Sequence, residues 1–64
     1  MRYINSTAVT GADYDANTGV LTLLVGNRLF EYTGVPAATY TGLLEADSAG
    51  RFYNSNIRSK FEVR

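Results

Sequence analysis

The most unusual segment of the chain covers residues 48–61, with the sequence SAGRFYNSNIRSKF. Its fourteen positions hold three basic side chains, two asparagines and four aromatic or large apolar side chains. Aromatic rings placed between arginines are typical of surfaces that hold flat, anionic ligands such as bases, nucleotides and phosphate backbones. The segment therefore predicts a binding module.

Several side chains are candidates for contact with such a ligand: Ser48, Arg51, Tyr53, Asn54, Arg58 and Lys60 in this segment, and Tyr32 outside it. The three basic side chains would contact phosphate groups, and a tyrosine with an exposed ring would stack on a base. Asn54 would read a base edge through its amide. Ser48 precedes a predicted helix, whose free N–H groups would hold a phosphate together with Arg51. We expect these residues to form one accessible patch.

Each of these side chains also has a structural alternative. Ser48 would cap the helix that follows it, Asn54 would cap or turn the segment, and Arg58 would form an ion pair with a nearby carboxylate. Four large side chains of the segment compete for the core: Phe52, Tyr53, Ile57 and Phe61. We expect two of the four inside, because a short domain has few apolar side chains to bury.

Catalysis is not expected from this chain, which has no histidine, no cysteine and a single lysine. Acid–base and nucleophilic chemistry at neutral pH normally needs one of the first two or a convergent carboxylate pair. Asp13, Asp15 and Asn17 have the alternate spacing of a calcium loop, but Leu24 stands where the bidentate glutamate belongs. We therefore expect a protein that is not an enzyme and has no metal and no cofactor.

The charges of the chain are balanced overall but unevenly placed. Residues 1–49 carry two basic and five acidic side chains, whereas residues 50–64 carry four basic side chains and one acidic one. The basic end suits a local anion-binding patch, while the neutral total argues against a protein held to nucleic acid by bulk electrostatics. No apolar run is long enough for a signal peptide or a membrane span, so we expect a cytoplasmic protein without membrane contact.

Two apolar runs, residues 20–25 and 28–33, flank Gly26 and Asn27, which predicts a tight β-hairpin. Pairing Val25 with Arg28 would place five side chains on one face, the expected core face: Leu21, Leu23, Val25, Phe30 and Tyr32. Leu24 and Leu29 would then form an exposed apolar pair on the other face. That pair is a candidate surface for self-association.

The remaining elements follow from spacing. Residues 9–14 predict an earlier strand, but its register is ambiguous by one residue, so alternation does not place Tyr14 inside or outside. Residues 36–47, with Pro36 in the first turn, and residues 49–57 predict two helices, and residues 60–63 a short closing strand. We expect one α+β domain over residues 1–64, a three-stranded antiparallel meander with this fourth short strand, packed on one main helix plus a short second helix.

The pattern as a whole resembles the KTSC domain. The resemblance rests on an aromatic-x-aromatic motif, here Phe30-x-Tyr32, on the later motif Phe52-Tyr53-Asn54, and on shorter matches along nearly all of the chain. Phe30 stands where the family often has tyrosine. The family is named for its place at the C-terminus of some lysyl-tRNA synthetases, and it also occurs as small free-standing proteins of bacteria and phages. The resemblance implies a role in RNA binding through that association.

Three hypotheses follow. The leading one is a non-catalytic module that binds RNA or a nucleotide-like phosphate ligand; with so neutral a chain, a short single-stranded or terminal feature fits better than a duplex. The second is a small homo-oligomeric phage protein that sequesters a cyclic or ADP-ribose-type nucleotide signal between subunits. The third is a protein-interaction module that uses the Leu24 and Leu29 pair or a free sheet edge.

Overall fold

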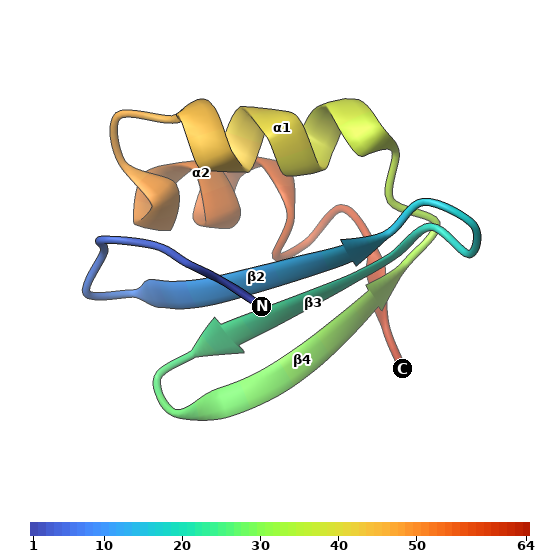
Figure 1. The fold of residues 1–64 in the computed structure, drawn as a ribbon, viewed down its shortest axis with the longest axis horizontal. Coiled ribbons are helices and arrows are strands. Elements are labelled where there is room, and N and C mark those ends of the chain that lie inside the picture. The colour runs from blue at the N-terminus through green and yellow to red at the C-terminus, as the bar shows by residue number, and fades with distance from the viewer.

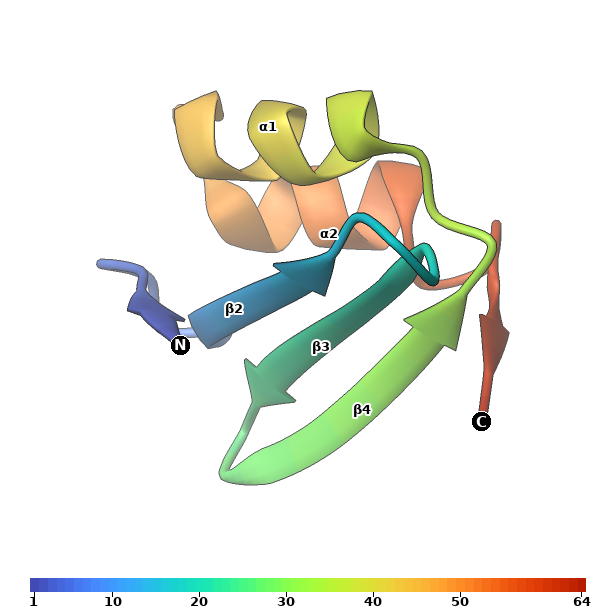
Figure 2. The ribbon, with the colours of Figure 1, turned by 45° about the vertical axis from the view of Figure 1, so that its right-hand side comes forward.

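A computed structural model describes all residues from Met1 to Arg64 as one antiparallel sheet with two helices on the same face (Figure 1 and Figure 2). The strands are β1 (Arg2–Tyr3), β2 (Val9–Asp15), β3 (Val20–Val25), β4 (Arg28–Thr33) and β5 (Glu62–Val63). The helices are α1 (Ala37–Glu45) and α2 (Ala49–Asn56). The strands follow one another in chain order across the sheet, as a meander does. The predicted α+β class is confirmed.

The hairpin of β3 and β4 has the predicted register. Leu21 pairs with Tyr32, Leu23 with Phe30 and Val25 with Arg28. Gly26 and Asn27 have φ angles of 55° and 66°. Positive φ at both loop residues is what a tight turn needs to match the twist of the two strands, and glycine and asparagine accept it at the lowest cost.

The core lies between the sheet and the helices. Its fully buried side chains include Leu21, Leu23 and Tyr32 from the sheet, with Leu43 from α1 and Ile57 directly after α2. The other two predicted core positions of the hairpin, Val25 and Phe30, are only half-buried. They lie next to the turn, and side chains packed less closely there leave an open space that is described below.

Tyr14 points to the helix side of the sheet. It pairs with Leu21, stacks on Tyr40 of α1 with ring centroids 5.3 Å apart, and donates a hydrogen bond of 2.6 Å to the Val35 carbonyl. The pairing of β2 with β3 shifts between Val9 and Gly11. This bulge changes the phase of alternation, so that Val9, Ala12 and Tyr14 all face the core although Val9 and Ala12 are three positions apart.

Both helices begin close to the predicted positions. Pro36 has a ψ angle of 152°, which is extended backbone, so α1 starts one residue later than a proline in the first turn would give. The Ser48 Oγ accepts a hydrogen bond of 3.3 Å from the Arg51 N–H and caps α2. A Cβ added to Gly42 of α1 would lie 2.8 Å from the Phe52 ring, so the two helices approach closely. Neither helix is long and apolar enough to cross a membrane.

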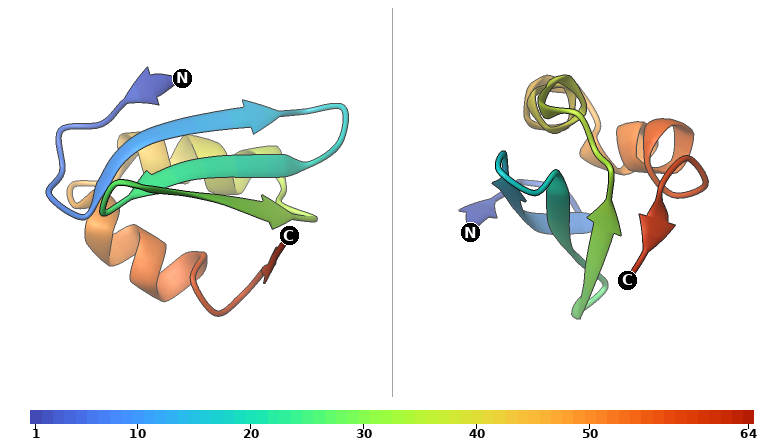
Figure 3. Two further views of the ribbon diagram at one scale, coloured as in Figure 1. Left: turned by 90° about the horizontal axis from the view of Figure 1, so that it is seen from below. Right: turned by 90° about the vertical axis from the view of Figure 1, so that its right-hand side faces the viewer.

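The opposite face of the sheet carries no helix, as the left view of Figure 3 shows. Leu24 and Leu29 pair across the hairpin on this bare face, and Leu29 is 63% exposed. Tyr3 of β1, a strand that the sequence did not predict, and Met1 are also largely exposed. The predicted pairing is confirmed and Leu29 is exposed as expected, but Leu24 is half-buried. The use of the pair in self-association stays a prediction.

Candidate functional site

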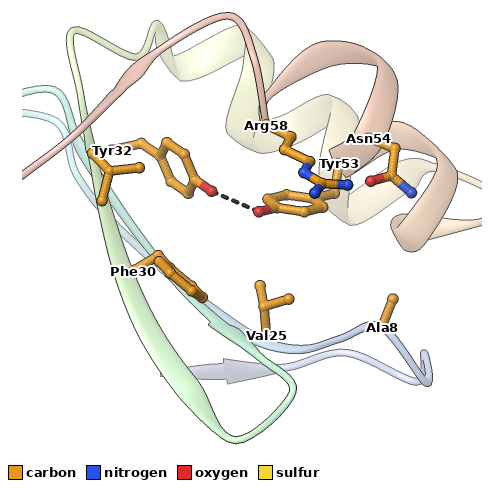
Figure 4. A pocket seen from close by; sticks show the side chains of 8 residues that line it. Ala8, Val25, Phe30, Tyr32, Tyr53, Asn54 and Arg58 are labelled. Carbon is orange, nitrogen blue, oxygen red and sulfur yellow. Dashed lines mark hydrogen bonds between the residues drawn. The ribbon is translucent and has the colours of Figure 1, made fainter.

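The principal cavity of the molecule is a half-open pocket of about 520 Å³ between α2 and the turn end of the β3–β4 hairpin. Figure 4 shows Tyr53, Asn54 and Arg58 on the helix side and Val25 and Phe30 on the sheet side. The lining comprises Ala8, Val25, Phe30, Tyr32, Tyr53, Asn54, Arg58 and Val63. We call this cavity the tyrosine pocket, after the two phenol groups that meet in it.

The phenol groups of Tyr32 and Tyr53 form the floor. Their hydroxyl oxygens lie 2.6 Å apart in a hydrogen bond, and their rings meet edge to face with centroids 6.1 Å apart. Tyr32 is 2% exposed and Tyr53 is 8% exposed. The residues meet because Tyr32 is on the core face of β4 and Tyr53 lies one helical turn before the buried Ile57 on the inner side of α2.

The environment of the floor favours the neutral phenol. Burial raises the pKa of Tyr32 well above its ordinary value, and the hydrogen bond to Tyr53 raises it further. The positive charge of Arg58 acts on the same group in the opposite direction and lowers its pKa. Arg58 and Tyr32 line the same pocket.

Arg58 and Asn54 provide the polar groups of the rim, and both side chains are exposed. The one salt bridge of the molecule joins Arg64 to Glu31, so the Arg58 guanidinium has no carboxylate partner. Arg58 reaches the pocket because α2 ends at Asn56, Ile57 turns into the core, and the next residue emerges beside it. The Asn54 amide makes no hydrogen bond to the protein, whereas the Asn56 amide bonds to the Phe52 carbonyl.

Apolar side chains form the remaining wall, and the sequence did not point to them as site residues. Val25 and Phe30 come from the hairpin, Val63 pairs with Tyr32 from β5, and Ala8 lies against the start of α2. A Cβ added to Gly50 would be 3.0 Å from the Ala8 Cβ, so the loop before β2 closes this side of the pocket. The sequence signal that could have identified Val25 and Phe30 as pocket residues was their position near the hairpin turn.

Both sequence motifs behind the family resemblance contribute to the tyrosine pocket. Phe30 and Tyr32 come from the first motif, and Tyr53 and Asn54 from the second. A family model described as the KTSC domain matches residues 5–61 of the chain. The chain belongs to the KTSC domain family. The resemblance drawn from the sequence is confirmed.

Relatives of this KTSC domain support the assignment at the level of sequence and of fold. A protein of Tsukamurella paurometabola is 34% identical over 64 residues, which cover 98% of this chain and 96% of the relative. The crystal structure of a KTSC domain protein from Yersinia pestis matches with a TM-score of 0.94 at 26% identity, covering 98% of this chain and 90% of that one. The fold is therefore that of a solved family member.

The predicted site residues of this KTSC domain divide between two places. Four of them, Tyr32, Tyr53, Asn54 and Arg58, line the tyrosine pocket. Ser48 and Arg51 instead line a separate depression of about 380 Å³ along another side of α2, together with Ala46, Asp47, Phe52, Ser55 and Asn56. Lys60 lines neither. The seven candidates therefore do not line one cavity, because Arg51 lies on another side of α2 than Tyr53 and Asn54.

The aromatic side chains also differ from the expectation in one respect. Tyr53 and Ile57 are buried and Phe52 and Phe61 are half-buried, so two of the four large side chains lie inside, as predicted. The expected exposed tyrosine for stacking is not found in Tyr32 or Tyr53, since the core encloses both rings. The half-buried Phe30 ring and Val25 offer the apolar surface of the pocket instead.

Proposed function

We propose that this KTSC domain is a non-catalytic binding module that takes a nucleotide-like phosphate ligand into the tyrosine pocket, either free or at an exposed position of a single-stranded RNA. The observation that carries the proposal is an arginine without a carboxylate partner beside a largely apolar cavity. An unpaired guanidinium at such a cavity favours a ligand with one anionic group and one flat, apolar part.

The pocket matches a nucleotide in size and in the arrangement of its cationic, apolar and amide groups. Its volume of about 520 Å³ falls within the range of small-molecule sites. In this arrangement Arg58 would contact the phosphate, Phe30 and Val25 would pack on the base, and the free Asn54 amide would bond to the base edge. The pocket is built within one chain, so this function does not require a subunit boundary.

The chemistry of the lining favours binding without catalysis. The pocket's titratable groups are two phenols and a guanidinium, and the raised pKa of Tyr32 keeps its proton in place at neutral pH. General acid–base catalysis works best with a group that titrates near the working pH. The pocket has a single unpaired arginine, and the net charge of the whole chain is zero. Both features fit a single phosphate better than a long phosphate track.

A titration followed by two-dimensional NMR of the backbone amides tests the proposal. Uridine 5′-monophosphate (UMP) and a short single-stranded RNA should shift the amides of Phe30, Tyr53, Asn54 and Arg58, and the affinity should fall as salt is added. Amides around Ser48 and Arg51 serve as the internal control and should move little. Shifts confined to the start of α2, or an affinity independent of salt, would contradict binding of a phosphate in the tyrosine pocket.

The bare face of the sheet supports self-association as a second candidate function. Its exposed apolar side chains, Leu29, Tyr3 and Met1, come from the N-terminal segment and the hairpin. A cluster of exposed apolar side chains on a small domain is typical of a surface that contacts another protein. Analytical ultracentrifugation of the wild type and of Leu29→Lys tests this candidate. A dimer that the substitution dissociates would support it, and a monomeric wild type at high concentration would refute it.

A further inference from the structure

The two hydroxyl groups on the floor of the tyrosine pocket hold one hydrogen-bond donor more than they use. Each phenol has one O–H proton, and one of the two protons lies in the bond of 2.6 Å between the oxygens. Neither hydroxyl makes another hydrogen bond to the protein. Whichever tyrosine donates within the pair, the proton of the other remains without a protein acceptor.

An acceptor for the spare proton has to come from whatever occupies the cavity. Both tyrosines line the pocket, and the nearby wall consists of the apolar side chains of Val25, Phe30 and Val63. These side chains accept no hydrogen bonds. An enclosed donor without a partner is costly, and more so than an oxygen with a free lone pair. The floor therefore favours a ligand atom or a water that accepts a hydrogen bond.

Arg58 adds donors on the same side of the pocket. Figure 4 shows the Arg58 guanidinium beside the Tyr53 ring, and both residues line the tyrosine pocket. A guanidinium has five N–H donors and no acceptor. Together the spare O–H and the guanidinium make a donor cluster at one end of a pocket whose opposite wall is apolar. Phosphate oxygens, which accept several charge-assisted bonds at once, match such a cluster.

We propose that the Tyr32–Tyr53 hydroxyl pair and Arg58 together bind a terminal phosphate of the ligand, so that the pocket recognises a phosphate at a chain end or on a free nucleotide. The inference rests on the proposed function and deepens it. An internal phosphodiester has a nucleotide on both sides, and a pocket closed at its floor admits only one of them. The base of the terminal nucleotide then packs on Phe30 and Val25.

Binding of UMP and of uridine to a set of variants tests this inference. In the wild type the phosphate should make UMP bind at least about tenfold more tightly than uridine. The double substitution Tyr32→Phe with Tyr53→Phe removes the spare donor and should reduce that advantage about fivefold or more, with little change for uridine. Either single substitution leaves one hydroxyl that still donates, so it should keep most of the advantage. Tyr3→Phe, which removes an exposed phenol, is the matched control.

The fold is expected to survive the double substitution, because removing both partners of a buried hydrogen bond while keeping the ring shape is nearly neutral. Thermal unfolding of each variant checks this. Two RNAs of the same sequence, one with a 5′-phosphate and one with a 5′-hydroxyl, then test the preference for a chain end. Only the phosphorylated RNA should compete with UMP.

The outcomes separate the inference from the function on which it rests. If UMP binds in the pocket but the double variant keeps the full phosphate advantage, the inference is overturned and the proposed function stands. Equal competition by the two RNAs would overturn the preference for a terminal phosphate. If neither UMP nor RNA binds in the pocket, the proposed function is refuted and the inference falls with it.

Discussion

The two ends of α2 both carry an arginine, yet they differ in what surrounds it. At the start of the helix, Arg51 lies in a shallow depression with the acidic Asp47 and the capping Ser48. At the other end, Arg58 stands beside a cavity with an apolar wall and a floor of two phenols. The first guanidinium is exposed on a side of α2 that does not line the tyrosine pocket, whereas the second stands beside a space that a flat ligand can fill.

This difference shows why the count of basic residues did not locate the site. A charge–charge contact that is fully exposed to water contributes little, because water and salt screen it. The same guanidinium next to apolar surface can combine its hydrogen bonds with the burial of a ring.

The largest effect is expected for Ile57→Ala, which removes a fully buried side chain from the C-terminal end of α2. Deleting that much apolar volume from a close-packed core should cost about 2–5 kcal/mol of unfolding free energy. Urea unfolding measures it. Because the side chain holds Tyr53 and Arg58 against the sheet, UMP binding should weaken as well. A loss below about 1 kcal/mol would mean that this end of α2 is less firmly packed than the burial indicates.

The next effect compares the two arginines directly. Arg58→Gln should weaken UMP binding about tenfold or more, since it removes a charge-assisted contact to the phosphate. Arg51→Gln, the matched control within α2, should change the affinity less than about twofold. Isothermal titration calorimetry measures both. Equal losses of affinity in the two variants would mean that both arginines contact the ligand, and would support the single patch expected from the sequence.

A third prediction uses pH to examine the floor of the pocket. A folded-state pKa of Tyr32 above its ordinary value near 10 means that the unfolded chain loses this proton first as the pH rises. The contribution of the Tyr32 proton to the free energy of unfolding is therefore fully present below about pH 10. Above that pH it declines, by up to about 1.4 kcal/mol per pH unit. Tyr32→Phe should flatten this decline in urea unfolding between about pH 10 and 12, whereas Tyr3→Phe should leave it steep. A wild type and a Tyr32→Phe variant with the same slope would exclude the effect.

The smallest effect is expected at the start of α2. Ser48→Ala removes the side-chain cap from the Arg51 N–H and should lower the unfolding free energy by about 0.5–1 kcal/mol. Its UMP affinity should remain that of the wild type, because the depression at this end is separate from the pocket. Thermal unfolding and the same calorimetric titration check the two parts. A clear loss of affinity in a folded Ser48→Ala protein would assign a binding role to the helix start.

Much of the fold followed from local sequence signals. The turn at Gly26 and Asn27 fixed the hairpin register, and two of the four large side chains in residues 48–61 were expected inside without being identified as Tyr53 and Ile57. The strand β1 was missed because two residues carry no periodic pattern. Tyr14 stayed ambiguous because the bulge between Val9 and Gly11 changes the alternation within one strand, and that irregularity depends on the neighbouring strand.

The site was only partly predictable for a related reason. Four of the seven candidate residues line the tyrosine pocket, but Phe30, Val25, Ala8 and Val63 were not among the candidates. Phe30 and Val25 were assigned to the core by alternation, which gives the face of a side chain and not how closely the helices cover it. Ala8 and Val63 come from segments that meet the pocket through the loop before β2 and the pairing of β5 with β4.

Turn residues and local spacing were enough to predict the hairpin register and every element except β1, and motifs spread along the chain were enough for the family. That Tyr32 and Tyr53, 21 positions apart, share a hydrogen bond, and that Arg58 lines their pocket while Arg51 does not, emerged from the packing of α2 on the sheet. The reason is that a cavity is the space left between packed elements. Its position depends on how far α2 extends over the sheet, a distance that no local pattern encodes.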